Sequence, residues 1–335
     1  MANPVLVEIT RGGIVESVHR GSIAGIDAKG AVKLALGDVE SPVYSRSSLK
    51  PMQAMPLVES GAAEAFGLSD EEVALACASH SGEPMHTTRV AAWLARLGLD
   101  ESDLACGVHA SRYEPVAEAM IRCGEKPSRL FNNCSGKHAG FLTVARHWDI
   151  ATKGYEQPNH PVQRAVATTL SELCDAGELP FGIDGCAAPN FATSLTQFAR
   201  AAARMAAPDK LERRRGEAAR RIIASMIAHP ELVSGTGRVC ATLMRASRGR
   251  AAVKAGAEGF YAAWIPERGL GIAIKIDDGA GRAAETVITA ALESLNLLDD
   301  SEPAHSILRA PIRNTRGAVV GERRPSSALA DLRLV

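Results

Sequence analysis

The chain has few aromatic residues and no excess of charge of either sign. Only 4% of its 335 residues are Phe, Trp or Tyr, whereas 46% are hydrophobic. A packed core must therefore consist mainly of Ala, Val, Leu and Ile. The chain has 38 basic residues (Lys and Arg) and 38 acidic residues (Asp and Glu), which gives a formal net charge of zero. Nucleic-acid binding usually needs a basic surface and aromatic side chains that stack on bases, so we expect no nucleic-acid partner.

The sequence also lacks the segments that direct a protein into or across a membrane. Its first residues do not form the charged and apolar blocks of a signal peptide, and no apolar run reaches the ~18 residues of a membrane span. The seven cysteines are an odd number. Without a secretion signal, they favour reduced thiols over a disulfide framework. We therefore expect a cytoplasmic protein that does not bind a membrane.

Strand patterns stand at both ends of the chain. Residues 4–40 alternate between apolar and polar side chains and contain glycine-rich turns, which is typical of an antiparallel β meander. Two more strands are predicted at 259–265 and 270–276, joined by a turn at 266–269. Because isolated hairpins are marginally stable and their edges need partners, we expect one antiparallel sheet. It is built from about 4–40 and 258–300 plus the C-terminal segment.

The middle of the chain, from about residue 49 to 230, has a helical pattern. It contains a capping box at Ser69–Glu72 and amphipathic stretches at 87–97, 136–148, 162–174 and 210–227. The sequence therefore predicts an α+β fold with helices packed on and beside the sheet, the plan of Ser-x-x-Lys hydrolases. Since there is no internal repeat or proline-rich linker, we expect a single catalytic domain over residues 1–335, with a loose polar tail from about residue 321.

A Ser-x-x-Lys motif lies where the helical pattern begins. Ser47 and Lys50 are three residues apart, so their side chains lie on one face of the first turn. Pro51 is tolerated in such a first turn, where a lysine cation is disfavoured by up to about 1 kcal/mol. An isolated match of this kind is usually a helix cap followed by a solvated lysine. In this position, a neutral lysine that takes the proton of a serine hydroxyl explains the pattern better.

A second serine and a second lysine are candidates for the same pocket. Ser79 lies in the loop 78–84, which is rich in turn-forming residues. Such loops often contain only side-chain caps, but Ser79 could also act as a nucleophile or proton shuttle. Lys254 precedes the C-terminal hairpin and is either a solvated lysine on an edge strand or, in a Ser-x-x-Lys fold, a residue that faces Ser79. The segment 235–238 is interpreted as a tight turn next to the substrate.

Thiols, a lysine and a histidine gather in two polar segments. Cys134, Lys137 and His138 fall within one helical turn, and Cys186 lies in a loop bounded by glycine and proline. Zinc ligands are normally Cys, His, Asp or Glu, so the sequence alone offers Cys134, His138 and Cys186. The remaining cysteines are interpreted as small buried apolar residues: Cys77, Cys106, Cys123, Cys174 and Cys240.

Six segments, taken together, resemble the L-asparaginase II family of class 3, rhizobial-type asparaginases. The resemblance runs in order over about residues 4 to 320 and rests on Ser-Arg-Ser-Ser-Leu-Lys-Pro, Ala-Ser-His-Ser-Gly-Glu, Asn-Asn-Cys-Ser-Gly-Lys-His-Ala-Gly, Ile-Asp-Gly-Cys-Ala-Ala-Pro, Gly-Thr-Gly-Arg and Lys-Ile-Asp-Asp-Gly-Ala. The resemblance implies a fold like that of serine β-lactamases and penicillin-binding proteins. It also implies a homodimer.

The resemblance further implies a set of site residues. It pairs Ser47 with Lys50 and Ser79 with Lys254 as catalytic groups. It also implies a zinc ion bound by Cys134, Lys137 and Cys186, with Asp184 close by. The candidate substrate-binding residues are Arg46, His138 and Asp184. A lysine can bind zinc only as the neutral amine, and an adjacent dication favours that form by lowering the pKa of the lysine.

On this basis we expect an amidohydrolase that converts L-asparagine to L-aspartate and ammonia. A serine activated by a neutral lysine would attack the side-chain amide, and zinc would mainly position the substrate. Spacing does not decide which serine is acylated. A serine-dependent glutaminase is also compatible with the motifs, since one methylene gives only about 10- to 200-fold discrimination. Three further hypotheses are Cys134 as the nucleophile with Lys137 beside it, a zinc-bound hydroxide, and a non-enzymatic zinc-dependent binding protein.

Overall fold

The structure is a computed structural model that describes residues 2–299 and 302–330, and the chain divides into two compact units. The sheet unit consists of Met1–Ser48, Thr193–Ala207 and Thr242–Val335, and the helical unit of Leu49–Ala192 and Pro208–Ala241. Within the described residues, no helix is long and apolar enough to span a membrane. The expectation of one catalytic domain over residues 1–335 stays a prediction.

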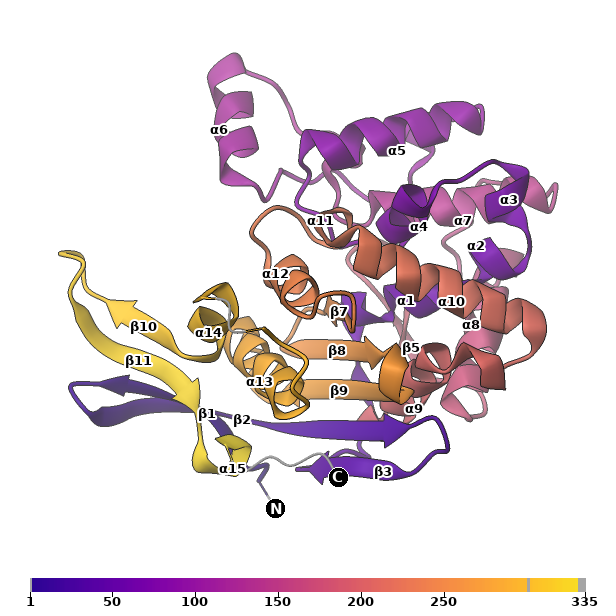
Figure 1. Cartoon of the computed structure of the whole chain (residues 1–335). Helices are drawn as coiled ribbons and strands as arrows, with labels where there is room; N and C mark the ends of the chain where they lie inside the picture. The colour runs from indigo at the N-terminus through magenta and orange to yellow at the C-terminus, as the bar shows by residue number, and fades with distance from the viewer. Residues whose placement is uncertain (1, 300–301, 331–335) are drawn as a thin grey trace. The chain divides into compact units, whose positions relative to one another are not determined.

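One antiparallel sheet, built from both ends of the chain, forms the sheet unit. Its strands are β1 (Val5–Arg11), β2 (Ile14–Asp27), β3 (Val32–Leu36), β7 (Ala252–Ala255), β8 (Phe260–Ile265), β9 (Leu270–Ile276), β10 (Ala310–Arg313) and β11 (Val319–Pro325). Their order is β10-β11-β1-β2-β9-β8-β7, and β3 also pairs with β2. Figure 1 shows the indigo β1 and β2 running beside the yellow β11 and the orange β9. The predicted α+β class, the meander and the hairpin are therefore confirmed.

The polar C-terminal segment is a strand, so the prediction of a loose tail from residue 321 is wrong for residues 321–325. β11 pairs with β1 on one side and with β10 on the other, and Arg324 forms an ion pair with Glu8 at 3.0 Å. Polar side chains do not prevent strand formation here, because the backbone groups of β11 are satisfied by pairing with the edge of β1. Residues 331–335 of the predicted tail lie outside the described residues.

Helices rich in small residues pack closely on this sheet. They are α9 (Leu195–Ala206), α13 (Gly281–Ser294), α14 (Glu302–Leu308) and α15 (Ser327–Ala330). α9 packs on β9, β2 and β8. At Gly271 of β9, a Cβ atom would lie only 2.2 Å from the carbonyl oxygen of Ala199 in α9. The low aromatic content is thus matched by close helix–sheet contact, which alanine and glycine permit.

A buried helix, α7 (Ser135–His147), lies at the centre of the helical unit. Residues 135–145 are all buried, and α7 packs against several other helices of this unit. Other helices of the unit are α1 (Lys50–Gln53), α2 (Met55–Glu59), α3 (Ala62–Ala65), α4 (Asp70–Ala76), α5 (Pro84–Arg96), α6 (Glu114–Cys123), α8 (Pro161–Cys174), α10 (Arg213–Ala228) and α11 (Pro230–Val233). The predicted capping box is confirmed, because the Ser69 hydroxyl accepts a hydrogen bond from the Glu72 N–H at the start of α4.

Short elements complete the chain. A strand β4 (Val43–Tyr44) precedes the turn η1 (Arg46–Leu49), a β5 (Phe181–Ile183) strand pairs with β6 (Pro189–Thr193), and α12 (Val239–Ala246) precedes β7. Further single turns of 3-10 helix are η2 (Glu101–Asp103), η3 (Arg129–Phe131), η4 (Pro208–Lys210) and η5 (Pro266–Arg268).

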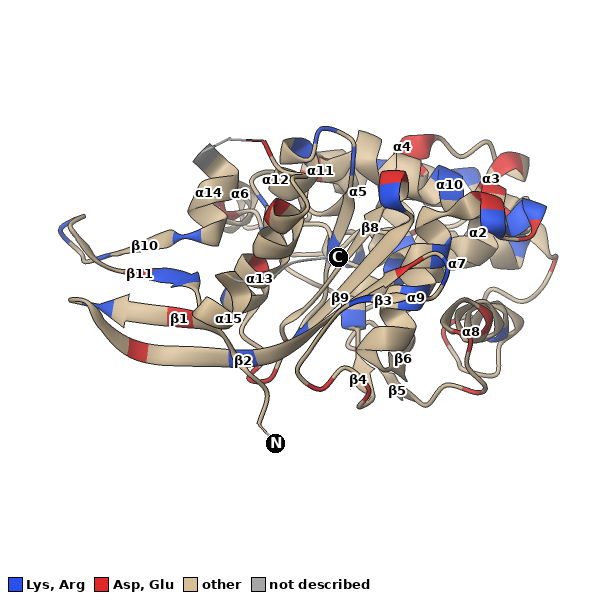
Figure 2. Ribbon diagram, turned by 60° about the horizontal axis from the view of Figure 1, so that its bottom comes forward, with Lys and Arg blue, Asp and Glu red and all other residues tan. Residues whose placement is uncertain are grey.

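The densest charge run of the sequence lies on α10 and is paired across the surface of the helical unit. Figure 2 colours basic and acidic positions on the ribbon, and both kinds occur on α10 and the neighbouring α2 and α3. Arg215 forms ion pairs with Glu59 and Glu172, and Arg221 contacts the carboxylate of Glu64 at 2.6 Å. The opposite face of α10 is buried and apolar. The run therefore forms the solvent-facing side of a helix.

Candidate active site

Lys50 is a buried lysine held at the start of α1. Its side chain is 1% exposed. The ammonium donates hydrogen bonds to the carbonyl oxygens of Ala78 and Asn133, the second at 3.2 Å, and to the Ser79 hydroxyl at 3.0 Å. A solvated lysine would make no such set of internal contacts, so the structure excludes the simple helix-cap interpretation for Lys50.

Ser79 is fixed from both sides. Its backbone N–H donates to the carbonyl oxygen of Val233 at 2.9 Å, and its half-buried hydroxyl lies against Lys50. Because the Ser79 N–H is already used, it is not available as an oxyanion-hole donor. Ser79 thus contacts Lys50, and its predicted pairing with Lys254 stays a prediction.

Ser47 and Lys254 both belong to the sheet unit. Ser47 is half-buried in the turn η1, after Arg46, whose backbone has a left-handed φ of 49°. Lys254 on β7 is 1% exposed, and its ammonium donates to the carbonyl oxygen of Ala255 at 2.8 Å. The Ser48 hydroxyl donates to the Lys254 carbonyl oxygen at 2.8 Å, so η1 is attached to β7. Lys254 is therefore not a solvated edge lysine, and the predicted pairs Ser47–Lys50 and Ser79–Lys254 stay predictions.

The two polar segments with cysteine meet in the helical unit. Cys134 precedes α7, Cys186 lies in the turn before β6, and the Lys137 ammonium donates to the Cys186 sulfur at 3.0 Å. The hydrogen bond from the Cys134 thiol lowers the pKa of Cys186 far below its usual range. Burial would raise this pKa, but the charge of Lys137 lowers it further. The same hydrogen bond, with burial, raises the pKa of Cys134.

Lys137 is also buried, with 3% of its surface exposed. Burial alone would lower the pKa of Lys137, but the Cys186 and Cys134 sulfurs outweigh it and raise that pKa. Without a metal, this part of the site therefore holds a thiolate–ammonium pair. Such a pair is stable in a buried position only because its two members neutralise each other.

Asp184 shapes the turn that carries Cys186. Its backbone exchanges hydrogen bonds with Ala187 and Ala188, at 2.9 and 3.0 Å. Its carboxylate accepts from the Gly185 N–H at 2.7 Å. Ala187 has a φ of 72°, in the left-handed region that an alanine rarely adopts. Asp184 stands two residues before Cys186, and these hydrogen bonds close the turn.

His138 lies behind the thiols and contacts Tyr155. Its Nδ1 is 2.6 Å from the Tyr155 hydroxyl, which in turn accepts a hydrogen bond from the Ala105 N–H at 2.8 Å. Burial lowers the pKa of His138, and the Cys186 sulfur opposes this shift only in part. Sequence reasoning missed Tyr155, because nothing in its local pattern indicates a contact with a residue 17 positions away.

Glu83 is a second residue that sequence reasoning missed. Its buried carboxylate accepts hydrogen bonds from the Ser81 hydroxyl at 2.6 Å and from the N–H and hydroxyl of Thr236 at 2.9 and 2.6 Å. Burial raises the pKa of Glu83, but these donors outweigh it and lower that pKa. Glu83 thus holds the predicted turn at 235–238 against the loop of Ser79. Its position before Pro84, at the start of a helix, was the available signal.

The donor set can be tested against the zinc ion that the resemblance implies. Within residues 2–299 and 302–330, no three His, Cys, Asp or Glu side chains form a group that could hold a metal ion. The set that the sequence alone offers, with His138 as the nitrogen ligand, stays a prediction. Two sulfurs and one amine do come together at Cys134, Cys186 and Lys137, and sulfur and nitrogen are the ligands that zinc prefers.

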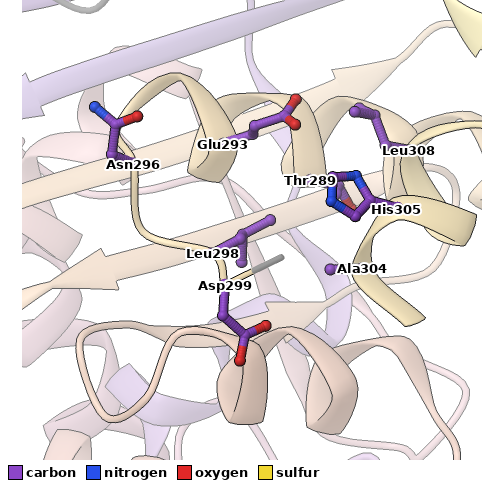
Figure 3. A pocket seen from close by; sticks show the side chains of 8 residues that line it. All are labelled: Thr289, Glu293, Asn296, Leu298, Asp299, Ala304, His305 and Leu308. Atoms are coloured by element: carbon purple, nitrogen blue, oxygen red, sulfur yellow. The ribbon is translucent and has the colours of Figure 1, made fainter. Parts of the chain in front are cut away.

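A separate cavity lies in the sheet unit, between α13 and α14. It has a volume of about 230 Å³ and contains none of the predicted site residues. Figure 3 shows the side chains that line it: Thr289, Glu293, Asn296, Leu298, Asp299, Ala304, His305 and Leu308.

Comparison with known proteins places the chain in a family. It matches no curated protein. A crystal structure of a protein called Mglu, in its native form, is similar with a TM-score of 0.51 and 13% identity; the match covers 84% of this chain and 66% of that one. A β-lactamase from Mycobacterium bovis is similar with a TM-score of 0.44 and 15% identity, over 83% of this chain and 95% of that one. At such low identity, the likeness to Mglu concerns the fold alone. The sequence model of the L-asparaginase II family matches residues 7–325, and the chain therefore belongs to the L-asparaginase II family.

Proposed function

We propose that the chain hydrolyses L-asparagine to L-aspartate and ammonia by serine catalysis with Lys50 as the base. The amidohydrolase activity follows from the family, and the assignment of catalytic groups is our own. The observation that supports it most directly is the 3.0 Å contact between the Lys50 nitrogen and the Ser79 hydroxyl. A non-enzymatic binding protein does not need a buried lysine against a hydroxyl.

In the proposed catalytic state, Lys50 is a neutral amine. Two carbonyl oxygens, of Ala78 and Asn133, can accept its two N–H groups. The lone pair is then directed to the Ser79 hydroxyl, whose proton it can take. Ser79 is the candidate nucleophile in this geometry, and Ser47, the serine of the Ser-x-x-Lys motif, is the alternative nucleophile.

The reaction then takes two steps. The serine oxygen attacks the side-chain amide carbon, its proton moves to Lys50, and the resulting intermediate expels ammonia with that proton. This leaves an ester between the serine and aspartate. A water molecule attacks the ester, Lys50 accepts its proton, and the serine recovers a proton as L-aspartate leaves.

The first experiment compares ammonia release from L-asparagine by the wild type, Lys50→Met and the exposed-surface control Lys210→Met. We expect a loss of about 10²- to 10⁴-fold in kcat for Lys50→Met, the usual contribution of a general base, and no change for the control. Thermal unfolding checks that both variants fold. A folded Lys50→Met with wild-type activity would refute the proposal.

A second experiment separates the nucleophiles and the substrates. Intact-mass measurement after denaturation of a reacting sample, followed by peptide mapping, identifies the acylated residue. An adduct on Ser47 or Ser79 supports the serine mechanism, whereas an adduct on Cys134 refutes it. Faster ammonia release from L-glutamine than from L-asparagine would favour a serine-dependent glutaminase.

We also propose that Cys134, Lys137 and Cys186 hold a zinc ion that positions the substrate. When bound, zinc would supply a fixed positive charge that attracts a substrate oxygen. The test is steady-state kinetics before and after chelation, with the metal content quantified in both samples. We expect KM to rise while kcat is largely kept. A loss of kcat to background in a folded protein would instead favour a zinc-bound hydroxide as the nucleophile.

The homodimer and the cytoplasmic location are further proposals. The homodimer is supported by family membership, and light scattering after size-exclusion chromatography tests it, with a single mass near the monomer value of 35.3 kDa as the contrary result. Seven cysteines without a disulfide support a reducing compartment.

A further inference from the structure

A chain of hydrogen bonds ends at the buried imidazole of His138. It begins at the Ala105 N–H, which donates to the Tyr155 oxygen at 2.8 Å, and continues to His138 Nδ1 at 2.6 Å. Tyr155 is 1% exposed and His138 is fully buried. The two rings meet edge to face, with centroids 5.5 Å apart. No solvent therefore competes for these donors and acceptors.

The direction of each bond in this chain is fixed by chemistry. A backbone N–H can only donate, so the Tyr155 oxygen is the acceptor of the Ala105 bond. The hydroxyl of Tyr155 then has one proton to donate, and Nδ1 of His138 is its only hydrogen-bond acceptor within the described residues. Because Nδ1 accepts, the proton of the neutral imidazole must sit on Nε2.

The opposite tautomer would leave the buried Tyr155 hydroxyl without an acceptor for its proton. If Nδ1 carried the proton, the Tyr155 oxygen would receive two N–H groups. Its own hydroxyl proton would then have no acceptor among the described residues. Leaving a buried donor unpaired costs about 1–3 kcal/mol, which corresponds to a population ratio of about 5- to 150-fold in favour of the Nε2–H tautomer.

The other ring nitrogen of His138 is Nε2. Nε2 of His138 is buried and makes no hydrogen bond of ordinary geometry with a described residue. His138 nevertheless lies close enough to the Cys186 sulfur for each to influence the other. A ring nitrogen that carries a proton has no lone pair for a metal, but it can direct that proton at a thiolate.

We propose that Tyr155 is a positioning residue that holds His138 as the Nε2–H tautomer, so that His138 does not itself bind a metal. In the proposed zinc site, this accounts for Lys137 as the nitrogen ligand although a histidine is adjacent in sequence. The inference goes beyond the proposed function, since the tautomer does not depend on which amide is hydrolysed.

The test is nuclear magnetic resonance of the full chain labelled with ¹⁵N in histidine. Long-range ¹H–¹⁵N correlation spectra distinguish ring nitrogens with and without a proton. The His138 signals are assigned as those that disappear in His138→Gln. We expect an unprotonated Nδ1 and a protonated Nε2 in the wild type, and a protonated Nδ1 would overturn the proposal.

Substitution of Tyr155 gives the second arm. Tyr155→Phe removes the donor to Nδ1, so we expect both tautomers to be populated. The ¹⁵N chemical shifts of the two ring nitrogens should then move toward intermediate values. Tyr113→Phe, at a tyrosine remote from His138 in the hydrogen-bond pattern, should leave the spectrum unchanged. A Tyr155→Phe protein that is folded and keeps the wild-type His138 spectrum would also overturn the proposal.

The outcomes are independent of the hydrolysis assay. The expected tautomer in a protein that releases no ammonia would refute only the proposed function. The other tautomer in an active asparaginase would refute only this inference. If Tyr155→Phe does not fold, the wild-type spectrum by itself decides.

Discussion

The stability of the helical unit should depend on pH through a buried histidine, His80. Its Nδ1 accepts a hydrogen bond from the Gly82 N–H at 3.1 Å, and its Nε2 is 2.9 Å from the Ser135 hydroxyl. The first bond requires an unprotonated Nδ1, so His80 is neutral in the folded protein. Burial lowers the pKa of His80 well below its ordinary value, and the positive charge of a protonated His86, stacked 4.9 Å away, would lower it further.

The sign and size of the effect follow from proton binding. Below pH about 6.5 the unfolded chain protonates His80, but the folded protein does not, so the free energy of unfolding falls as pH falls. The contribution of His80 is fully present above pH 6.5. It should decrease by about 1.3 kcal/mol between pH 7.0 and 5.5. His86, whose pKa is also lowered mainly by burial, should add a smaller loss.

Urea unfolding at pH 7.0, 6.5, 6.0 and 5.5 measures this effect for the wild type and His80→Gln. The variant should be less stable at pH 7.0, but its stability should change with pH by about 1.3 kcal/mol less than that of the wild type over this range. The exposed His305→Gln serves as the matched control and should follow the wild-type curve. Parallel curves for the wild type and His80→Gln would refute the neutral, buried state of His80.

Two backbone positions give further predictions, both measured by urea unfolding. Gly271→Ala should lower the free energy of unfolding by about 3 kcal/mol or more, because its Cβ would lie 2.2 Å from the carbonyl oxygen of Ala199. The control is Gly281→Ala, since nothing lies within 4 Å of the added carbon. Equal losses of stability in the two variants would contradict the packing argument. Ala187→Gly should raise the free energy of unfolding by up to about 1 kcal/mol, since glycine adopts the φ of 72° without strain; a loss of stability would show that the turn is not strained.

The fold could be predicted where a residue depends mainly on its close neighbours in sequence. The alternation of residues 4–40, the hairpin after residue 259 and the capping box at Ser69 all follow from local periodicity and local hydrogen bonds. β11 could not be predicted in this way, because a polar segment forms a strand only when it pairs with the edge of another strand, here one that is distant in sequence. Its partner, β1, lies more than 300 residues away in the sequence.

The candidate site, too, could be predicted only in part from the sequence. The sequence alone indicated Lys50, Ser79, Cys134, Lys137 and Cys186 as candidate site residues, because their motifs are short and contiguous. Only the tertiary structure decided which groups meet. It brought Ser79 to Lys50 across 29 positions and Cys186 to Lys137 across 49. Such contacts depend on how buried helices and turns pack, and the sequence spacing between two residues does not report that distance.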